Sequence, residues 1–352
     1  PSELRDRIVD NGSGNPLYIE ELVKMLIEQR VILTEESYWS VDEKRLDETV
    51  IPATLTGVIQ SRLDRLSPPE KGVLQRASVI GHEFWDAAVD RLEPGVNVQT
   101  VLESLRSKEL LYQKQNSAIS DTKEFVFKYA LLRDVTYETV LISDRKKWHG
   151  LIADWLVTVK SESGNEFSQA IAEHFQMGGK ISEAAKWFAV AGKQAQLSHS
   201  PDPAVRLIRK ALGLWLENER DSEESADTLE WREVLVRALW SRGDFAAAAE
   251  ESEKMYSAAL DIGDLCWQTR ALTEISVSMF ESGKTSKALE AGKKAVEVGR
   301  KSGTTDTARM ALSNALFRYG RTVYTLGEFE KAEKIAKEAV EVSKDFDEVG
   351  LK

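Results

Sequence analysis

The feature that most constrains this chain is a short motif that recurs in its second half. A glycine is followed five residues later by an alanine in four segments: Gly179 with Ala184, Gly243 with Ala248, Gly283 with Ala288, and Gly327 with Ala332. The last three glycines are separated by 40 and 44 residues, from 243 to 283 and from 283 to 327. A repeat of this length is typical of stacked helical hairpins, each of which buries its apolar stripe only against its neighbours.

In most copies a second alanine follows seven residues after the first. The pairs are Ala184 with Ala191, Ala288 with Ala295, and Ala332 with Ala339, and the segment from Ala204 to Ala211 repeats the pair without the glycine. Seven residues correspond to two helical turns, so both alanines face the same way and let a neighbouring helix approach closely. The glycine precedes this helix, where a tight turn favours a residue without a Cβ atom.

The last copy carries the most specific pattern. Eight of its residues resemble a tetratricopeptide (TPR) repeat in type and spacing. They are Leu316, Tyr319, Gly320, Tyr324, Gly327, Phe329, Ala332 and Ala339. Copy 248 departs from the pattern, because Met255 stands where the second alanine is expected. We therefore expect TPR-like helical repeats from about Phe167 to the C-terminus, with helices longer than the standard 34-residue repeat would hold.

Composition excludes several classes of protein. A chain of 352 residues with a net charge of −11 is long enough for two or three structural units, and it lacks the basic face typical of nucleic-acid binding. The single cysteine, Cys266, excludes an internal disulfide and any site with several cysteine ligands; we interpret it as a small buried residue. The four histidines lack zinc spacing, and no apolar run is long enough to span a bilayer.

The first half contains the element order of a winged-helix domain. The predicted helices are 3–10, 16–29, 55–66, 68–80, 84–92, 98–110, 130–139 and 144–159, and the predicted strands are 31–33, 38–41, 111–113 and 125–127. Residues 47–52 are interpreted as a linker. Ser67, Pro68 and Glu70 form a capping-box pattern that predicts a helix start. Three helices followed by two strands around a polar loop predict the winged helix.

Three segments of the first half resemble signal-transduction ATPases of the STAND class. Gly14-Asn15-Pro16-Leu17 is similar to the Gly-x-Pro element of the helical lid in that class. The start of the winged-helix domain in that class is similar to Pro52–Leu55, Arg62–Leu66 and Ala77–Gly81 of this chain. The end of that domain is similar to residues 125–141 and 148–153. The arrangement is that of large bacterial regulators, including LuxR-type activators and class III nucleotide cyclases.

The resemblance implies a mainly α fold in three parts. A helical lid remnant with a short hairpin (1–50) precedes a winged-helix-type domain (51–160) and a TPR-like α-solenoid (161–352). In that class the lid proline packs on adenine, which makes Pro16 a candidate nucleotide contact. A winged-helix histidine senses the phosphates; Tyr129 stands at that position here, and a phenol donates a hydrogen bond but does not become cationic.

The chain lacks a phosphate loop of its own. No Gly-x4-Gly-Lys-Ser/Thr pattern follows a predicted strand, and Gly283-Lys284-Thr285 belongs to a repeat turn, with Ser278 in place of the first glycine. We expect no cofactor in this fragment, with ATP or ADP binding only together with an absent upstream module. Because the sequence begins at Pro1 inside a predicted helix, we interpret it as a piece of a larger cytoplasmic protein.

The leading hypothesis is a regulatory interaction fragment without catalysis. Its repeats would bind a protein or peptide in their groove, or upstream domains of the same chain, and tryptophans such as Trp231 and Trp267 would lie in the core or groove. A second hypothesis is DNA contact through the 98–110 helix, where Arg106 and Lys108 are balanced by Glu103 and Glu109. A third is an enzyme, but no residues in the sequence form a recognisable catalytic set.

Overall fold

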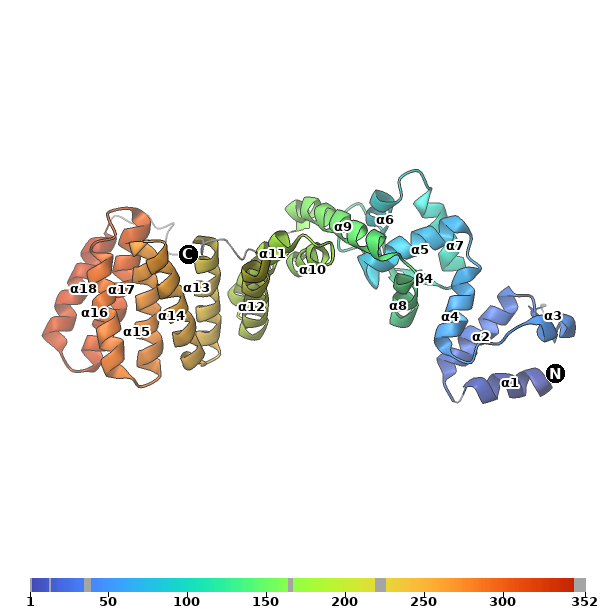
Figure 1. Ribbon diagram of the computed structural model, residues 1–352, viewed down its shortest axis with the longest axis horizontal. Helices are drawn as coiled ribbons and strands as arrows, with labels where there is room; N and C mark the ends of the chain where they lie inside the picture. Colours follow the sequence, from blue (N-terminus) through green and yellow to red (C-terminus); the bar gives the residue numbers. More distant parts are fainter. Residues whose placement is uncertain (1, 13, 35–38, 164–166, 219–225, 345–352) are drawn as a thin grey trace. The chain divides into compact units, whose positions relative to one another are not determined.

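The computed structural model describes residues 2–12, 14–34, 39–163, 167–218 and 226–344. These residues form 18 helices and five short strands (Figure 1), which confirms the prediction of a mainly α chain. The chain divides into two compact units: the N-terminal unit, Pro1–Gly164 with Met177–Gly179, and the repeat unit, Asn165–Gln176 with Lys180–Lys352. Within the described residues, no helix is long and apolar enough to cross a membrane.

The N-terminal unit contains nine helices and all five strands of the described chain. The helices are α1 (Ser2–Gly12), α2 (Pro16–Glu28), α3 (Glu43–Glu48), α4 (Leu55–Asp64), α5 (Pro68–Ile80), α6 (Asp86–Leu92), α7 (Val98–Ser107), α8 (Ala130–Glu138) and α9 (Ile142–Ser163). The strands are β1 (Ile32–Thr34), β2 (Trp39–Val41), β3 (Glu83–Trp85), β4 (Leu111–Gln113) and β5 (Glu124–Phe127).

Helix α2 forms the centre of the first hydrophobic core. The Asn15 side chain accepts hydrogen bonds from the Leu17 and Tyr18 amides and so caps the helix start. The apolar stripe of α2 is buried with Val58 of α4. The predicted hairpin is present as β1 and β2, which pair antiparallel with Ile32 opposite Val41; Tyr38, predicted at the start of its second strand, lies outside the described residues.

A three-stranded antiparallel sheet in the order β3-β5-β4 holds the second core of this unit. Phe84 of β3 lies opposite Phe125 of β5, and their rings stack at 5.8 Å. The prediction of a helix from Phe84 was therefore wrong, because backbone pairing with β5 takes Glu83–Trp85 into the sheet and α6 begins only at Asp86. The periodic apolar residues 84, 88 and 92 did not distinguish the two structures.

The predicted linker at 47–52 also contains structure. Helix α3 covers Glu43–Glu48, and Asp42 caps it by accepting a hydrogen bond from the Arg45 amide. Leu46 is buried in the first core. A single apolar residue in a charged stretch gives no periodic signal in the sequence. Helix α3 therefore forms because Leu46 is buried in the tertiary structure.

The repeat unit is a stack of helical hairpins. After α10 (Ser168–Met177) come α11 (Ile181–Leu197), α12 (Pro201–Asn218), α13 (Ala226–Ser241), α14 (Phe245–Asp261), α15 (Leu265–Glu281), α16 (Thr285–Gly299), α17 (Asp306–Thr325) and α18 (Phe329–Ser343). From α11 onward each helix packs against the next. Helices α11, α13, α15 and α17 also pack in succession, and Figure 1 shows α13 to α18 side by side. The predicted helical repeats are present.

The motif glycines lie in the turns between helices. Gly179, Gly243, Gly283 and Gly327 have φ values of 77°, 76°, 74° and 81°, and Gly263 between α14 and α15 has 71°. The Gly243 amide donates to the Trp240 carbonyl oxygen, and the Asp244 amide donates to the Leu239 carbonyl oxygen. These two hydrogen bonds are those of a Schellman motif. A residue without Cβ adopts this left-handed conformation at least cost.

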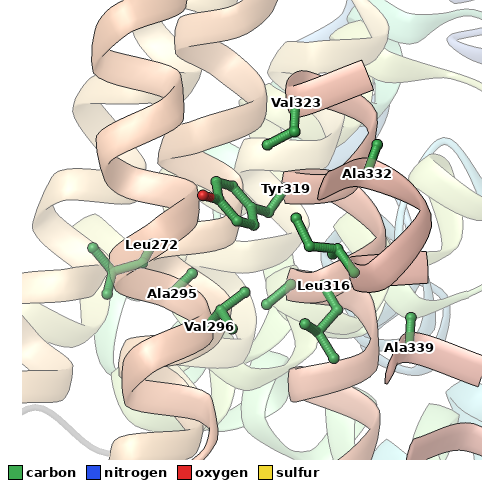
Figure 2. Packing of buried hydrophobic residues seen from close by; sticks show 10 residues of the cluster. Leu272, Ala295, Val296, Leu316, Tyr319, Val323, Ala332 and Ala339 are labelled. Atoms are coloured by element: carbon green, nitrogen blue, oxygen red, sulfur yellow. The ribbon is translucent and has the colours of Figure 1, made fainter. Parts of the chain in front are cut away.

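The motif alanines are buried where helices pack. Ala184, Ala248 and Ala288 are fully buried and Ala332 nearly so. Figure 2 shows the last part of this core, in which small and large side chains of α15, α16, α17 and α18 alternate. Its residues are Leu272, Ala295, Val296, Ala315, Leu316, Tyr319, Val323, Ala332, Ile335 and Ala339. Alanines on one helix leave room for the larger residues of the next, as close-packed interiors require.

Candidate functional site

A groove in the repeat unit is the first candidate site. A cavity of about 550 Å³ lies over α13, α15, α17 and α18. We call it the repeat groove; its lining residues are Glu233, Arg237, Arg270, Thr307, Met310, Ala311, Ser313, Asn314, Phe317, Ala339, Val340 and Ser343. Helix α17 contributes half of them, at the three- and four-residue spacings that place side chains on one face of a helix.

The groove combines exposed apolar side chains with arginines. Phe317 is 62% exposed, Val340 61% and Met310 44%. Beside them, Arg270 donates from Nε and Nη2 to the buried carboxylate of Glu233, and Arg237 donates to the same carboxylate at 3.1 Å. Large apolar groups next to guanidinium groups are typical of surfaces that bind peptide segments.

Sequence analysis predicted the groove but not its residues. The groove lining contains no tryptophan: Trp231 is buried, and Trp215 packs edge-on against it at 5.4 Å. Phe317 supplies the aromatic group instead. The available signal was the stripe 307, 310, 314 and 317, which lies apart from the buried alanines of the same helix. Cys266, predicted to be buried, is half-buried, and its Sγ lies 3.6 Å from the Thr307 carbonyl oxygen.

A second candidate is a cluster of charged side chains inside the N-terminal unit. We call it the ion cluster; its members are Glu20, Glu21, Lys24, Glu28, Arg62, Glu109 and Lys128. Glu21 of α2 and Arg62 of α4 are buried and form an ion pair. Arg62 also donates to Glu28 and, at 2.9 Å, to the Lys108 carbonyl oxygen. The cluster thus joins α2, α4 and the end of α7 through one guanidinium group.

Lys128 connects the end of β5 to the same helix. Its Nζ donates to Glu20 at 2.6 Å and to Glu21 at 3.2 Å. Hydrogen bonds from Lys128 and then Lys24 lower the pKa of Glu20 to about 2. Lys24 also binds Glu109, and this contact lowers the pKa of the Glu109 carboxyl. Glu20 therefore stays ionised throughout the physiological pH range.

The two candidate nucleotide contacts lie in different surroundings. Pro16 is exposed at the first position of α2, whereas the hydroxyl of Tyr129, at the N-cap of α8, is buried without a hydrogen-bond partner among the described residues. Burial and then the charge of nearby Glu21 raise the Tyr129 pKa, so the phenol stays neutral. Along the axis of α2, Glu21 lies about 7.5 Å beyond Pro16. The role of Pro16 and Tyr129 in nucleotide binding stays a prediction.

The two cations of the 98–110 segment have partners within the N-terminal unit. Arg106 donates to Gln113 at 3.0 Å, and Lys108 binds both oxygens of Glu70 at 2.6 and 2.8 Å. Arg106 is exposed and its partner is neutral, so DNA contact through this helix stays a prediction. Among the described residues, no group of three or more His, Cys, Asp or Glu could hold a metal ion.

Comparison with known proteins gives distant similarities. No protein-family model matches the chain. An uncharacterized protein of Rhizobium meliloti (strain 1021) is 21% identical over 263 residues, which are 74% of this chain and 24% of the relative. This chain therefore spans about a quarter of the length of that relative.

Among solved structures, aspartyl phosphate phosphatase F from Bacillus subtilis aligns over 82% of this chain and 68% of its own, with 15% identity and a TM-score of 0.45. A STAND protein with a tetratricopeptide-repeat sensor from Pyrococcus horikoshii aligns over 98% and 51%, with 17% identity and a TM-score of 0.34. A Rap protein complexed with competence and sporulation factor aligns over 92% and 77%, with 10% identity and a TM-score of 0.37. Each of these TM-scores lies below 0.5.

Proposed function

We propose that the repeat unit binds a protein or peptide segment in the repeat groove. The observation that carries the proposal is the exposure of Phe317, Met310 and Val340 around one cavity. An aromatic side chain that is exposed in the free protein and surrounded by apolar neighbours gains free energy when a partner covers it. Binding energy concentrates on such anchors, so Phe317 is the residue on which affinity should depend most.

The test is selection of peptides from a random dodecapeptide display library on the immobilised full chain. Phe317→Asp places a charge at the centre of the groove, and we expect it to lose the peptides that the unchanged chain enriches. Phe329→Asp is the matched control, because Phe329 is 60% exposed and lies outside the groove lining. Equal enrichment on the unchanged chain and on Phe317→Asp would contradict the proposal.

For the N-terminal unit we propose the lid and winged-helix part of a STAND-type signalling ATPase. The order α5, α6, α7, β4, β5, with β3 as the third strand, supports the winged helix, and the Pro16 start of α2 supports the lid. In this proposal Pro16 and Tyr129 would contact ATP or ADP that an upstream module holds, and the chain would be a cytoplasmic regulator without catalysis of its own.

Calorimetry with ADP tests this part of the proposal. Without a phosphate loop the fragment lacks the amides and lysine that hold phosphates, so we expect a dissociation constant weaker than about 1 mM, which corresponds to about 4 kcal/mol of binding free energy. Micromolar affinity, or ADP release from ATP by this chain alone, would contradict it.

A further inference from the structure

The charged residues of the repeat groove do not balance. The groove lining holds two guanidinium groups, of Arg237 on α13 and Arg270 on α15, and one carboxylate, of Glu233. Arg318 on α17 and Glu274 on α15 lie beside this set but outside the lining. With all five ionised, three positive and two negative charges leave a net charge of +1. The whole chain carries −11, so the groove is a local exception to the charge of the molecule.

Glu233 is already saturated by its neighbours. Its Oε1 accepts from Arg237 Nη2 at 3.1 Å and from Arg270 Nε at 3.0 Å, and its Oε2 accepts from Arg270 Nη2. Glu233 is buried, so these bonds hold the two arginines in place at the floor of the groove. A carboxylate shared by two guanidinium groups leaves unused donors on both.

Arg237 keeps donors that solvent reaches. The Arg237 side chain is 55% exposed and donates one hydrogen bond within the described residues. Arg318 forms no ion pair within them, and its guanidinium carbon lies 5.9 Å from the centre of the Phe317 ring. The structure therefore places the exposed Arg237 in the groove lining and the half-buried Arg318 beside Phe317.

Glu274 is the second carboxylate near these arginines. It is half-buried on α15, and burial raises the pKa of its carboxyl although the charge of Arg237 opposes the shift. A ligand that supplies a carboxylate would thus complete the set of ion pairs, whereas a ligand that supplies an ammonium group would be repelled.

We infer that the repeat groove selects peptide segments in which an Asp or Glu side chain lies close to a large apolar side chain. This inference rests on the proposed function of the same groove. Arg237 and Arg318 would bind the carboxylate, and Met310, Phe317 and Val340 would cover the apolar side chain. Charge complementarity of this kind gives specificity because the wrong charge costs more than the right one gains.

The residues of the peptides selected on the full chain test the inference. In the pool that depends on Phe317, we expect Asp and Glu to exceed Lys and Arg by at least about threefold relative to the starting library, since opposite charges attract across a partly desolvated groove. A Phe317-dependent pool without this excess would overturn the inference and leave peptide binding by the groove intact. Absence of any Phe317-dependent pool would overturn both.

A single enriched peptide then locates the contact. We expect Arg237→Gln and Arg318→Gln each to weaken binding of its Glu form by about tenfold in fluorescence anisotropy, and to leave binding of its Gln form within about twofold. Arg206→Gln, an exposed arginine on α12 outside the groove, is the control. Equal weakening of both peptide forms, or displacement of the Glu peptide by a twelve-residue thymidine oligonucleotide, would overturn the assignment of the carboxylate to these arginines.

Discussion

In the N-terminal unit, α2, α4 and the end of β5 meet through charged side chains, whereas in the repeat unit successive helices meet through alanine and glycine. Arg62 binds Glu21 across 41 residues of sequence, and Lys128 binds Glu21 across 107. In the repeat unit, a Cβ atom on Gly192 of α11 would lie 2.6 Å from Ile208 of α12. The first unit thus adds distant ion pairs to its apolar cores, whereas the second combines close approach of neighbouring helices with ion pairs such as that of Arg270 with Glu233.

The two kinds of contact respond to different changes. A buried ion pair adds little net stability, but removal of one partner leaves a charge without compensation in a medium of low dielectric constant. A close helix contact has no charge to lose, but an added methyl group forces the backbones apart. The comparison therefore predicts which substitutions matter in each unit, and the four predictions below run from the largest expected effect to the smallest.

Replacement of Arg62 by Met should have the largest effect, a loss of about 3–5 kcal/mol from the stability of the N-terminal unit. Glu21 is fully buried, and the substitution removes the guanidinium group shared by Glu21 and Glu28, so that Lys128, at 3.2 Å, remains the partner of Glu21. Hydrogen exchange of α2 and α4 in the full chain measures the loss. The control is Arg65→Met at the exposed C-cap of the same helix, which should change the stability by less than about 0.5 kcal/mol. Similar hydrogen exchange in both variants would show that the ion cluster does not stabilise the N-terminal unit.

Replacement of Glu70 by Gln should cost about 1.5–3 kcal/mol near pH 7, the range for hydrogen bonds to charged groups. Glu70 accepts from the Ser67 amide at 2.9 Å, from Ser104 at 2.7 Å and from Lys108 at 2.6 Å. Burial alone would raise the Glu70 pKa, but hydrogen bonds from Lys108, Ser104 and Ser67 outweigh it and lower the pKa to about 2.

The sign of the pH dependence follows from that pKa. Because the folded pKa lies below the ordinary value of 4.5, the carboxylate stabilises the fold fully above pH 4.5 and loses this effect as the pH falls toward 2. Urea unfolding should therefore show a difference between the unchanged chain and Glu70→Gln that shrinks between these pH values. Glu103→Gln, at an exposed position on α7, is the control; a difference that stays constant down to pH 2 would assign the loss to packing.

The contrast between local and distant contacts also explains what the sequence could reveal. The repeat unit was predictable because its signals, a glycine turn and paired alanines, lie within single hairpins. The capping box was predictable for the same reason: Ser67 and Glu70 are three residues apart and bind each other at 2.8 Å. Helix α3 and strand β3 were missed because distant residues decide them, Leu46 through burial in the first core and Phe84 through pairing with Phe125.

The candidate sites divide in the same way. A groove was expected from the repeat architecture, but Arg237, Arg270 and Phe317 come from three hairpins whose relative register no single segment encodes. The ion cluster gave no signal in the sequence, because Glu20 and Glu21 are adjacent on a helix and their partners lie far along the chain. Their partners Arg62 and Lys128 become apparent only when the fold brings α4 and the end of β5 to α2.

Replacement of Gly192 by Ala tests the close contacts of the repeat unit. The added Cβ would lie 2.6 Å from two side-chain atoms of Ile208 and 3.3 Å from its backbone nitrogen, and overpacking of this kind costs about 1–3 kcal/mol. Gly213→Ala on α12 is the matched control, because its Cβ would meet no atom within 4 Å and alanine should stabilise the helix by up to about 1 kcal/mol. Opposite changes in thermal midpoint are expected; stabilisation by both substitutions would show that the helices can move apart freely.

Replacement of His199 by Gly should have the smallest effect, a gain in stability. His199 occupies the turn between α11 and α12 with φ of 56°. The Ser200 amide donates to the Ala195 carbonyl oxygen, and the Asp244 amide after Gly243 donates to the Leu239 carbonyl oxygen in the same way. The left-handed conformation costs an L-residue about 1–2 kcal/mol, and glycine removes this cost. Glycine also makes the unfolded chain more flexible, which offsets part of the gain, so we expect a net stabilisation of about 0.5–1 kcal/mol.

Two further variants separate the backbone from the imidazole. His199→Ala removes the ring but keeps Cβ and should leave the thermal midpoint unchanged, whereas Gly243→Ala should lower it by about as much as His199→Gly raises it. If His199→Ala were as stabilising as His199→Gly, the gain would come from loss of the imidazole. Changes of equal size and opposite sign at positions 199 and 243 would instead show that the two turns are equivalent in energy as well as in geometry. The preference for glycine would then extend to a turn whose left-handed residue is histidine.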